Sequence, residues 1–253
     1  MLLFSARAWL ATLLYIVCFA LTAEQKQREA HLVIGVQDFE DYQPYSYWLN
    51  GQYKGFNREL FDLFSDFINT RILYQAFSVK RRSMALVEGD ASAVYPDNPN
   101  WAMATKAKHT IVYSQPVVSF VDGIFVQKTS HNLKVSELKR LGVPLGFTPT
   151  PYLSSIELGV IKTHYDANLG VLLKMLDEGA LDGVYINKAV AEHWLANNPD
   201  IAQRLTFANQ LPYIEDSRYL SSRDNGELID LFNHFLKTRA AAIDALKSKY
   251  GLK

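Results

Sequence analysis

Hydrophobic and polar residues follow two different periods along this chain. Short apolar runs rich in β-branched residues, such as residues 32–36, have the pattern of buried strands. Between them, stretches such as residues 57–68 carry apolar side chains at every third or fourth position, which is the spacing of one helix face. Strands that alternate with helices in this way predict mostly parallel sheets with helices on both sides, an α/β fold.

The same alternation occurs in both halves of the chain, which predicts two α/β lobes that face each other. Asn57 and Asp166 are interpreted as helix N-caps, and Gly89 and Gly179 as residues that end helices. The tract 38–55, rich in Tyr, Asn and Gly, is expected to be loop. Strands are expected near residues 32–36, 72–77, 91–95, 110–113, 143–147 and 182–186. Helices are expected near residues 57–68, 82–88, 154–161, 166–176 and 189–196, with a short one after residue 101 and two in 227–250.

A short motif ends one expected strand in each half. Residues 88–97 read Glu-Gly-Asp-Ala-Ser-Ala-Val-Tyr-Pro-Asp, and residues 178–187 read Glu-Gly-Ala-Leu-Asp-Gly-Val-Tyr-Ile-Asn. Tyr95 thus matches Tyr185, and Asp97 matches Asn187. Ligands of open α/β sheets lie beyond the carboxyl ends of the strands, so these four side chains are expected to line one cleft. A routine helix end followed by tyrosines that pack at a strand end remains the alternative.

The N-terminus has the pattern of a secretory signal peptide over residues 1–23. Arg7 precedes an apolar run at 9–21, and the small residue Ala23 precedes a charged stretch. The run is shorter than the ~20 residues that span a bilayer, so cleavage is favoured over retention as an anchor. Export to the periplasm is therefore expected. Cleavage would remove Cys18, the one cysteine in the sequence.

Composition narrows the class of partner. The 26 basic and 26 acidic residues balance, which argues against nucleic acid and against an anionic membrane surface. The chain lacks a glycine-rich phosphate loop, a close pair of metal ligands and a nucleophile motif. We therefore expect no catalytic residues, metal or cofactor, and a small polar molecule or another protein as the partner.

Six weak motifs occur in an order that resembles one known family. The motifs are residues 32–36, Tyr-Gln-Pro-Tyr at 42–45, Tyr-Lys-Gly-Phe-Asn at 53–57, Leu-Val-Glu-Gly-Asp at 86–90, Ile-Val-Tyr-Ser-Gln-Pro at 111–116 and Leu-Asp-Gly-Val-Tyr-Ile-Asn at 181–187. In this order they make the chain similar to the bacterial periplasmic solute-binding proteins of the family 3 type, which include amino-acid receptors of ABC transporters.

The resemblance implies a periplasmic binding protein type II-like fold, with two α/β lobes joined by a two-stranded hinge. The crossings are expected near residues 118–123 and 207–212. Lobe 1 would then comprise residues 24–120 with 210–253, and lobe 2 residues 121–209. The resemblance also implies a monomer that closes on its ligand and delivers it to a membrane permease of an ABC transporter.

Two departures from the family concern its ligand clamp. The arginine that usually binds the ligand carboxylate is replaced by Ala107, and the aspartate that takes the ligand ammonium corresponds to Asn187. The resemblance therefore implies a ligand other than an ordinary α-amino acid. The expected ligand-binding residues are aromatic and polar: Tyr42, Tyr45, Tyr95, Asp97, Asn98, Trp101, Thr150, Tyr152, Tyr185 and Asn187.

Several alternatives stay open from the sequence. Thr150 lies between two prolines, which either present it to an anion or merely shape a turn. The basic cluster Lys80-Arg81-Arg82 either supplies cationic contacts or faces solvent. The partner that reads the closed form is a transporter or, alternatively, a signalling protein. An enzyme on the same fold is the third alternative, since some proteins with this fold are dehydratases.

Overall fold

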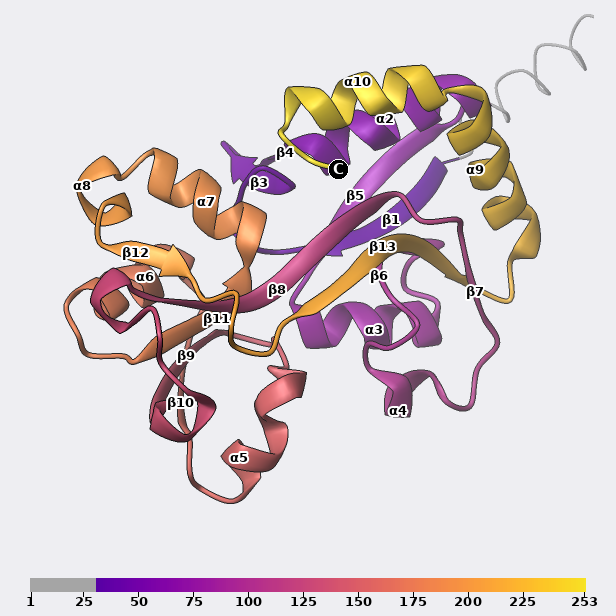
Figure 1. Cartoon of the computed structure of the whole chain (residues 1–253). Coiled ribbons are helices and arrows are strands. Elements are labelled where there is room, and N and C mark those ends of the chain that lie inside the picture. Colours follow the sequence, from indigo (N-terminus) through magenta and orange to yellow (C-terminus); the bar gives the residue numbers. More distant parts are fainter. Residues whose placement is uncertain (1–30) are drawn as a thin grey trace, which may run out of the picture.

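The computed structural model describes residues 31–253, which form two α/β lobes joined by two long antiparallel strands (Figure 1). The expected signal peptide and Cys18 lie outside the described residues. No helix within 31–253 has the length and apolar character needed to cross a membrane.

Lobe 1 is built on three parallel strands. β1 (His31–Gln37) pairs with both β5 (Arg71–Phe77) and β6 (Ala93–Asp97). In Figure 1, α2 (Phe56–Ile68), α9 (Gly226–Thr238) and α10 (Ala240–Lys249) cover one face of this sheet, and α3 (Val79–Glu88) covers the other. The short α4 (Met103–Lys106) and β7 (Ile111–Tyr113) follow β6.

Lobe 2 repeats the plan with a smaller sheet. β9 (Arg140–Pro144) pairs in parallel with β10 (Lys162–Asp166) and with β11 (Gly183–Asn187). The remaining elements are α5 (Leu153–Glu157), α6 (Leu169–Asp177), α7 (Lys188–Ala196), α8 (Pro199–Ala202), β12 (Leu205–Phe207) and 3₁₀ turns at Lys128–Ser130, Val135–Glu137 and Thr150–Tyr152.

The strands β8 (Val118–Gln127) and β13 (Ile214–Arg223) join the lobes. They pair antiparallel from Ile214 opposite Asp122 to Arg218 opposite Val118. β8 then continues beside β11 and β12, and β13 continues beside β6 and β7. The central path of the sheet is therefore β10-β9-β11-β8-β13-β6-β1-β5. The two strands that carry the repeated motif, β6 and β11, flank the joining pair on either side.

The tract predicted to be loop at 38–55 contains a small antiparallel sheet instead. Its strands are β2 (Asp41–Tyr42), β3 (Ser46–Leu49) and β4 (Gln52–Lys54). Asn50 and Gly51, with φ of 51° and 72°, make the tight turn between β3 and β4. An Asn-Gly pair with positive φ at both residues is a strong hairpin signal, so the prediction of loop and turn missed the strands on either side of it.

Two predicted N-caps are each wrong by two residues, because Gly55 precedes α2 and Asn168 precedes α6. Helix α2 begins at Phe56, and the side chain of Asn57 is buried, where its Nδ2 donates to the hydroxyl of Tyr53 at 3.1 Å. Asp166 ends β10, and Asn168 caps α6 through a hydrogen bond from the Val171 amide at 3.2 Å. The two predicted glycine stops are confirmed: Gly89 and Gly179 follow helices with φ of 84° and 75°.

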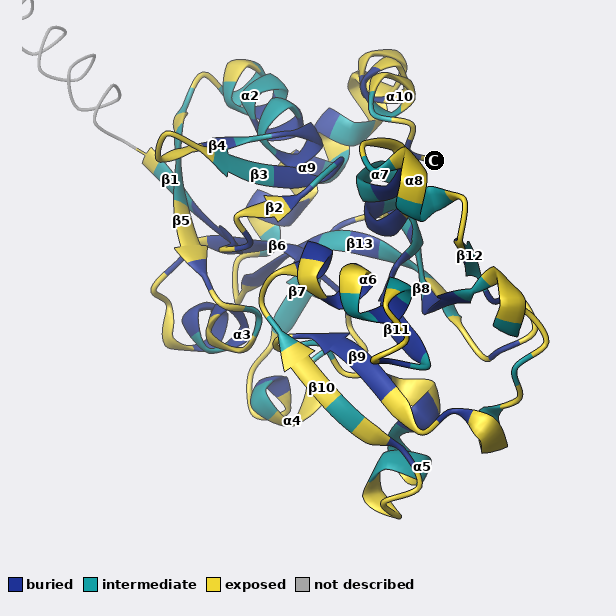
Figure 2. Ribbon diagram, turned by 90° about the vertical axis from the view of Figure 1, so that its left-hand side faces the viewer, coloured by how far each residue is buried: buried dark blue, intermediate teal, exposed yellow. Residues whose placement is uncertain are grey.

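Aromatic packing holds the helices of lobe 1 on the sheet. The rings of Phe61 and Phe64 on α2 lie 5.7 and 4.9 Å from that of Phe232 on α9, and all three are fully buried. Figure 2 shows this buried interior beneath exposed helix surfaces. Because each such ring removes a large apolar area from water, this cluster is a main source of the lobe's stability.

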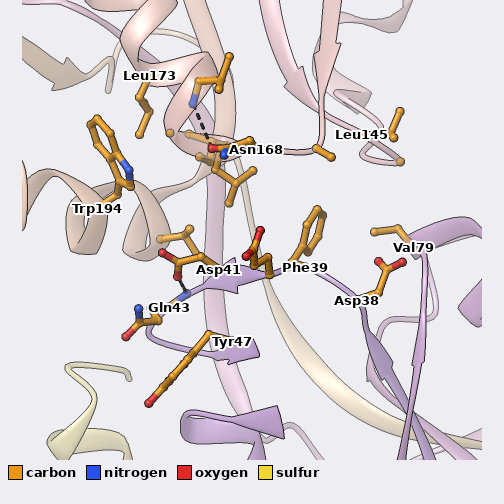
Figure 3. Close-up of a pocket in the computed structure, with 18 of the residues that line it drawn as sticks. Asp38, Phe39, Asp41, Gln43, Tyr47, Val79, Leu145, Asn168, Leu173 and Trp194 are labelled. Carbon is orange, nitrogen blue, oxygen red and sulfur yellow. Dashed lines mark hydrogen bonds between the residues drawn. The ribbon is translucent and has the colours of Figure 1, made fainter. Parts of the chain in front are cut away.

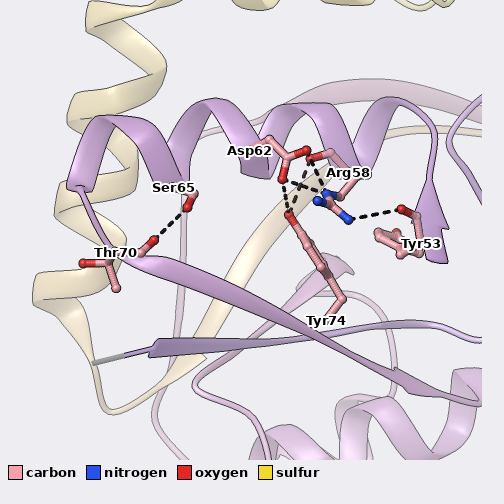
Figure 4. A network of polar contacts seen from close by, with 6 residues as sticks. All are labelled: Tyr53, Arg58, Asp62, Ser65, Thr70 and Tyr74. Carbon is pink, nitrogen blue, oxygen red and sulfur yellow. Dashed lines mark hydrogen bonds and ion pairs between the residues drawn. The ribbon is translucent and has the colours of Figure 1, made fainter. Parts of the chain in front are cut away.

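A polar network fixes α2 over its neighbouring strand (Figure 4). Arg58 Nε donates to Asp62 at 2.7 Å, and the hydroxyl of Tyr74 on β5 donates to the same carboxylate at 3.3 Å. At the far end of the helix, Ser65 Oγ donates to the carbonyl of Thr70 at 2.7 Å. The ion pair is partly exposed, so it sets the helix orientation more than it adds stability.

A buried ion pair lies at the carboxyl end of β6. Lys106 Nζ is 3.1 and 3.3 Å from the carboxylate oxygens of Asp97 and 2.8 Å from the carbonyl of Asn98. Ser221 Oγ on β13 donates to the same carboxylate at 2.6 Å. Burial lowers the pKa of Lys106, and Asp97 opposes that effect. The pair therefore ties β6, α4 and β13 together.

Removing one member of this pair should destabilise the fold. In Asp97→Ala the buried ammonium of Lys106 loses its counter-charge, so we expect the free energy of unfolding to fall by about 3–5 kcal/mol. The double variant Asp97→Ala/Lys106→Met removes both charges and should recover most of that loss. Urea unfolding measures both, and a single variant within about 0.5 kcal/mol of the wild type would contradict a structural role for the pair.

Glycine is required at position 55, before α2. Gly55 has φ 98° and ψ −172°, and a Cβ there would lie 2.8 Å from the carbonyl oxygen of Tyr45. Such a conformation is nearly restricted to glycine. The close approach holds the turn of Tyr45 against the start of α2, as does the hydrogen bond from the Asn57 amide to the Tyr45 carbonyl at 2.9 Å.

Gly55→Ala should therefore lower the free energy of unfolding by about 2–5 kcal/mol, from backbone strain and overpacking together. Gly51→Ala is the matched control, because Gly51 also has positive φ but a Cβ there meets nothing within 4 Å. That control should lose about 1–2 kcal/mol. Equal losses in the two variants, measured by urea unfolding, would show that the approach to Tyr45 is not a constraint.

Candidate ligand-binding site

The two lobes meet through aromatic side chains next to the joining strands. Phe147 of lobe 2 lies edge-on to Phe39 and Tyr42 of lobe 1, with ring centroids 5.8 and 6.1 Å away. Tyr42 and Tyr45 come from either side of the first turn of the small β2–β4 sheet, and each is 1% exposed. The 38–55 tract of lobe 1 thus places aromatic faces against lobe 2.

Arg218, on β13, lies at the centre of this meeting point. Its guanidinium carbon is 3.7 Å from the centroid of the Tyr45 ring, 5.4 Å from that of Tyr42 and 5.6 Å from that of Phe120. Its Nη2 donates to the hydroxyl of Tyr42 at 3.2 Å. A guanidinium over aromatic faces is attracted by the negative charge of the ring faces, and the attraction grows when water is excluded. Arg218 therefore joins the hinge to lobe 1.

Asp122, on the adjacent strand β8, joins the hinge to lobe 2. Its carboxylate accepts a hydrogen bond from Asn187 Nδ2 at 2.8 Å, and Asn187 Oδ1 accepts one from the Val190 amide, at 3.3 Å, as the N-cap of α7. Burial raises the pKa of Asp122, while Arg218 and Asn187 act to lower it. Burial also raises the pKa of Tyr42 and Tyr45, so both hydroxyls are neutral donors at physiological pH.

A cleft of about 970 Å³ opens beside this cluster, between the 38–48 segment of lobe 1 and helices α6 and α7 of lobe 2 (Figure 3). Acidic and aromatic side chains line the lobe 1 wall, and amide, basic and indole groups line the other. The lining residues include Asp38, Glu40, Asp41, Tyr47 and Trp48 on one side, and Asn168, Lys174, His193 and Trp194 on the other. This volume fits a small organic molecule.

The rim of the cleft closes by direct contact between the lobes. Gly146 of lobe 2, with φ 88°, lies against Val79 at the start of α3, where an added Cβ would be 2.9 Å from the Val79 Cβ. Lys80, the next residue of α3, lines the cleft. The lobes therefore touch at this rim of the cleft.

Five of the ten side chains expected at the ligand lie at or next to this meeting point: Tyr42, Tyr45, Tyr95, Tyr185 and Asn187. Tyr95, on β6, packs edge-on against Phe61 at 5.2 Å, and its hydroxyl has no hydrogen-bond partner among the described residues. Tyr185, on β11, precedes Asn187 by two residues. The rings of Tyr185 and Tyr152 lie edge to face at 6.1 Å.

The other five side chains lie farther out. Asp97 is engaged by Lys106, and the Nδ2 of Asn98 donates to the Ser217 carbonyl at 2.9 Å. Tyr152 donates from its hydroxyl to the carbonyl of Pro212 at 2.6 Å. Trp101 packs against Phe120 at 5.5 Å, and Thr150 is exposed. Asp97, Asn98, Tyr152 and Trp101 therefore brace the joining strands and the segment next to them.

The three residues of the basic cluster at 80–82 lie in three different environments. Arg81 forms surface ion pairs with Glu88 and Asp90 at 2.6 Å each, and Lys80 faces the cleft. Arg82 is instead buried, at 2% exposure. Arg218 and Asp122 were not among the residues predicted from the sequence, because nothing local marks an Arg in a polar stretch or an Asp in an apolar strand as interior.

Metal chemistry receives no support from the described part of the chain. Within residues 31–253, no group of three or more His, Cys, Asp or Glu side chains is arranged to hold a metal ion.

The sequence matches no protein-family model and no curated protein sequence. Similar solved structures exist, however. A histidine kinase sensor domain with similarity to periplasmic binding proteins is 17% identical, with a TM-score of 0.71 over 90% of this chain and 98% of that chain. An amino acid ABC transporter substrate-binding protein from Streptococcus pneumoniae, bound to L-arginine, is 19% identical, with a TM-score of 0.68 over 88% and 94%.

A third structure is an ancestral amino acid-binding protein described as a precursor of cyclohexadienyl dehydratase. It is 20% identical, with a TM-score of 0.69 over 90% of this chain and 99% of that chain. These likenesses span nearly the whole length of each structure. They confirm the predicted fold class, and the chain therefore has the type II fold of the periplasmic binding proteins.

Proposed function

We propose that this protein is a periplasmic solute-binding protein that captures a small polar ligand between its lobes by hinge closure. One observation carries the proposal: side chains from both lobes and both joining strands converge beside a cleft of about 970 Å³. Arg218 and Asp122 come from the joining strands, Tyr45 from lobe 1 and Asn187 from lobe 2. These four side chains lie next to the cleft and are not among its lining residues, so a ligand in the cleft would lie beside the cluster that links both lobes to the joining strands.

Closure would be a rotation about the joining strands. The proposed lobe 1 comprises residues 24–120 with 210–253, and the proposed lobe 2 comprises residues 121–209. Domain closure of this kind buries the ligand and creates a new surface that a partner recognises. The Gly146–Val79 and Phe147–Tyr42 contacts support closure because they join the two lobes without a covalent link.

The ligand is proposed to differ from an ordinary α-amino acid. The usual carboxylate arginine is replaced by Ala107, at the end of α4, and the usual ammonium-binding aspartate by Asn187. Asp97 does not supply a free charge, since Lys106 neutralises it. A ligand with flat faces and several hydrogen-bonding groups suits the tyrosines and tryptophans around the cleft.

Transport and sensing are both compatible with the proposal. Delivery to an ABC transporter permease is proposed first, because the signal-peptide pattern and the similarity to a transporter's substrate-binding protein support a free periplasmic monomer. Presentation to a signalling receptor is the alternative, supported by the similarity to a sensor domain. An enzyme is the third candidate, supported by the dehydratase precursor, and it would show turnover where a binding protein shows saturation.

A thermal-shift screen of the purified protein against amino acids, polyamines, organic acids, sugars and nucleosides tests the proposal. We expect one class to stabilise the protein, by about 2.7 kcal/mol at 100 times its dissociation constant. Asn187→Ala should weaken that ligand at least about tenfold, a loss of about 1.4 kcal/mol, because it removes the contact between Asp122 and lobe 2.

The control is Asn225→Ala, which removes the N-cap of α9, a hydrogen bond from the Leu228 amide at 3.1 Å, away from the cleft. Both variants lose a helix cap and about 1 kcal/mol of stability. Isothermal titration should then show wild-type affinity for the control alone. If Asn187→Ala binds as tightly as Asn225→Ala, the ligand does not lie at the meeting point of the lobes.

A further inference from the structure

Among the described residues, two buried guanidinium groups carry N–H donors that no acceptor pairs, although Arg218 Nη2 does donate to the Tyr42 hydroxyl. Arg82 and Arg218 are each 2% exposed, and Nε and Nη1 of both have no hydrogen-bond acceptor among the described residues. Neither forms an ion pair with any described carboxylate. A buried charge is ordinarily paired, because burying one without compensation is costly. Four unpaired donors in one region are therefore a signal of something to be bound.

The unpaired groups gather at the carboxyl edge of the lobe 1 sheet. Gln37 ends β1, Tyr95 lies near the end of β6, and Arg82 lies in the first turns of α3, which follows β5 directly. The Gln37 Oε1 and the Tyr95 hydroxyl are also without partners among residues 31–253. Ligands of parallel α/β sheets lie beyond this edge.

The charges of the two guanidinium groups act on each other and on shared neighbours. Burial, opposed by Asp97 and reinforced by the charge of Arg218, lowers the pKa of Arg82 to about 10. The charges of Arg82 and Arg218 both act to lower the pKa of Tyr53, which burial raises. The charge of Arg218 also acts to lower the pKa of the Tyr95 hydroxyl, which burial raises.

Among the buried side chains of residues 31–253, cations outnumber anions. Among the described residues, the buried charged side chains are Arg82, Lys106, Arg218 and Asp97, and Asp122 adds a partly buried carboxylate that faces Arg218. Asp97 is bonded to Lys106 at 3.1 Å, so it is not free for Arg82. Arg82 thus has no carboxylate within ion-pairing distance among the described residues, and one bound monoanion would supply it.

We propose that Arg82 and Arg218 together hold a carboxylate group of the ligand, with the Tyr95 hydroxyl as an added donor. The proposal rests on the ligand-capture function above and names the chemical class: a small molecule that bears a carboxylate. The unpaired N–H groups of both arginines donate to its oxygens, which are charge-assisted hydrogen bonds. The two arginines come from α3 and the hinge, so they replace the clamp that Ala107 cannot provide.

Both arginines lie close to contacts between the lobes, so separation of the lobes would give a ligand access to them. Arg82 lies two residues after Lys80, which lines the cleft, and three after Val79, which contacts Gly146 of lobe 2. Arg218 lies under Tyr45, whose ring is 3.7 Å away at the lobe boundary. Separation of the lobes uncovers the start of α3 and the hinge strand together, and closure returns both arginines to a dry environment.

The test compares carboxylates with neutral analogues in three proteins: the wild type, Arg82→Gln and Arg81→Gln. Arg81 is the matched control, because it is the preceding residue on the same helix and pairs at the surface. Sodium acetate, against sodium chloride at equal ionic strength and against acetamide, should raise the melting temperature of the wild type and of Arg81→Gln, but not of Arg82→Gln. Arg218→Gln should behave as Arg82→Gln does.

A second measurement separates a binding role from a structural one. Without ligand, Arg82→Gln should melt no lower than the wild type, because it removes an unpaired buried charge, whereas a structural arginine would lower the melting temperature. For any carboxylate found by the ligand screen, Arg82→Gln should weaken binding at least about tenfold.

Three outcomes overturn the inference. They are an acetate effect equal to that of chloride, an acetate effect that survives in Arg82→Gln, and a screened ligand that is neutral and binds Arg82→Gln as tightly as the wild type. The last outcome would leave ligand capture between the lobes intact. A screen in which no ligand stabilises the protein, beside a clear acetate effect that needs Arg82, would instead contradict the proposed function and support the anion site.

Discussion

The antiparallel pairing of β8 with β13 is the interaction on which the rest of this structure depends. Each strand belongs to both lobes: β8 pairs with β11 and β12 on one side, and β13 pairs with β6 and β7 on the other. Ten strands thereby form one sheet, and the main hydrophobic cluster of the described residues includes Phe61 of lobe 1 and Leu172 of lobe 2. Because the lobes share a sheet only through this pair, bending at the pair moves them as units. Arg218 and Asp122 lie on the two strands themselves, so these charges beside the cleft are fixed to the axis of that motion.

The polar interior around this axis is costly in stability, and that cost is informative. A core can be filled with apolar side chains, yet this one contains unpaired guanidinium groups at Arg82 and Arg218 beside a neutralised pair at Lys106 and Asp97. The neutralised pair has an evident structural role, because it joins three elements. Arg218 does contact Tyr42 and Tyr45, but Nε and Nη1 of both arginines have no acceptor among the described residues. Proteins break the rule that buried charges are paired mainly where function requires it, which is the physical reason to place the ligand's anionic group there.

Much of the fold could be predicted from periodicity, but much of the site could not. Helices such as α2 and α9 repeat phenylalanine and leucine on one face, and β1 and β11 contain short apolar runs with β-branched residues, so both kinds of element were predictable. β13 is different because most of its residues are polar and it contains no apolar run. Its role depends on partners that are distant in the sequence. The Asn50-Gly51 hairpin did carry a local signal that was missed. The burial of Arg82 beside the exposed Arg81 follows from the helix face, whereas the Lys106–Asp97 pair and the position of Arg218 depend on strand register, which no local pattern encodes.

The central claim is that the lobes close about β8 and β13 onto a ligand, and one distance tests it most directly. Gln52 on β4 and Glu192 on α7 are exposed and belong to elements on opposite sides of the cleft, which Trp48 and Trp194 line. The sequence has a single cysteine, Cys18, in the expected signal peptide, so spin labels on Gln52→Cys and Glu192→Cys can be placed without background in a cleaved chain. Pulsed electron paramagnetic resonance would then give the distance between the labels. Hinge closure predicts a broad distribution of longer label-to-label distances without ligand and a single, shorter distance with saturating ligand. The same distribution in both conditions, with binding confirmed by titration, would contradict it.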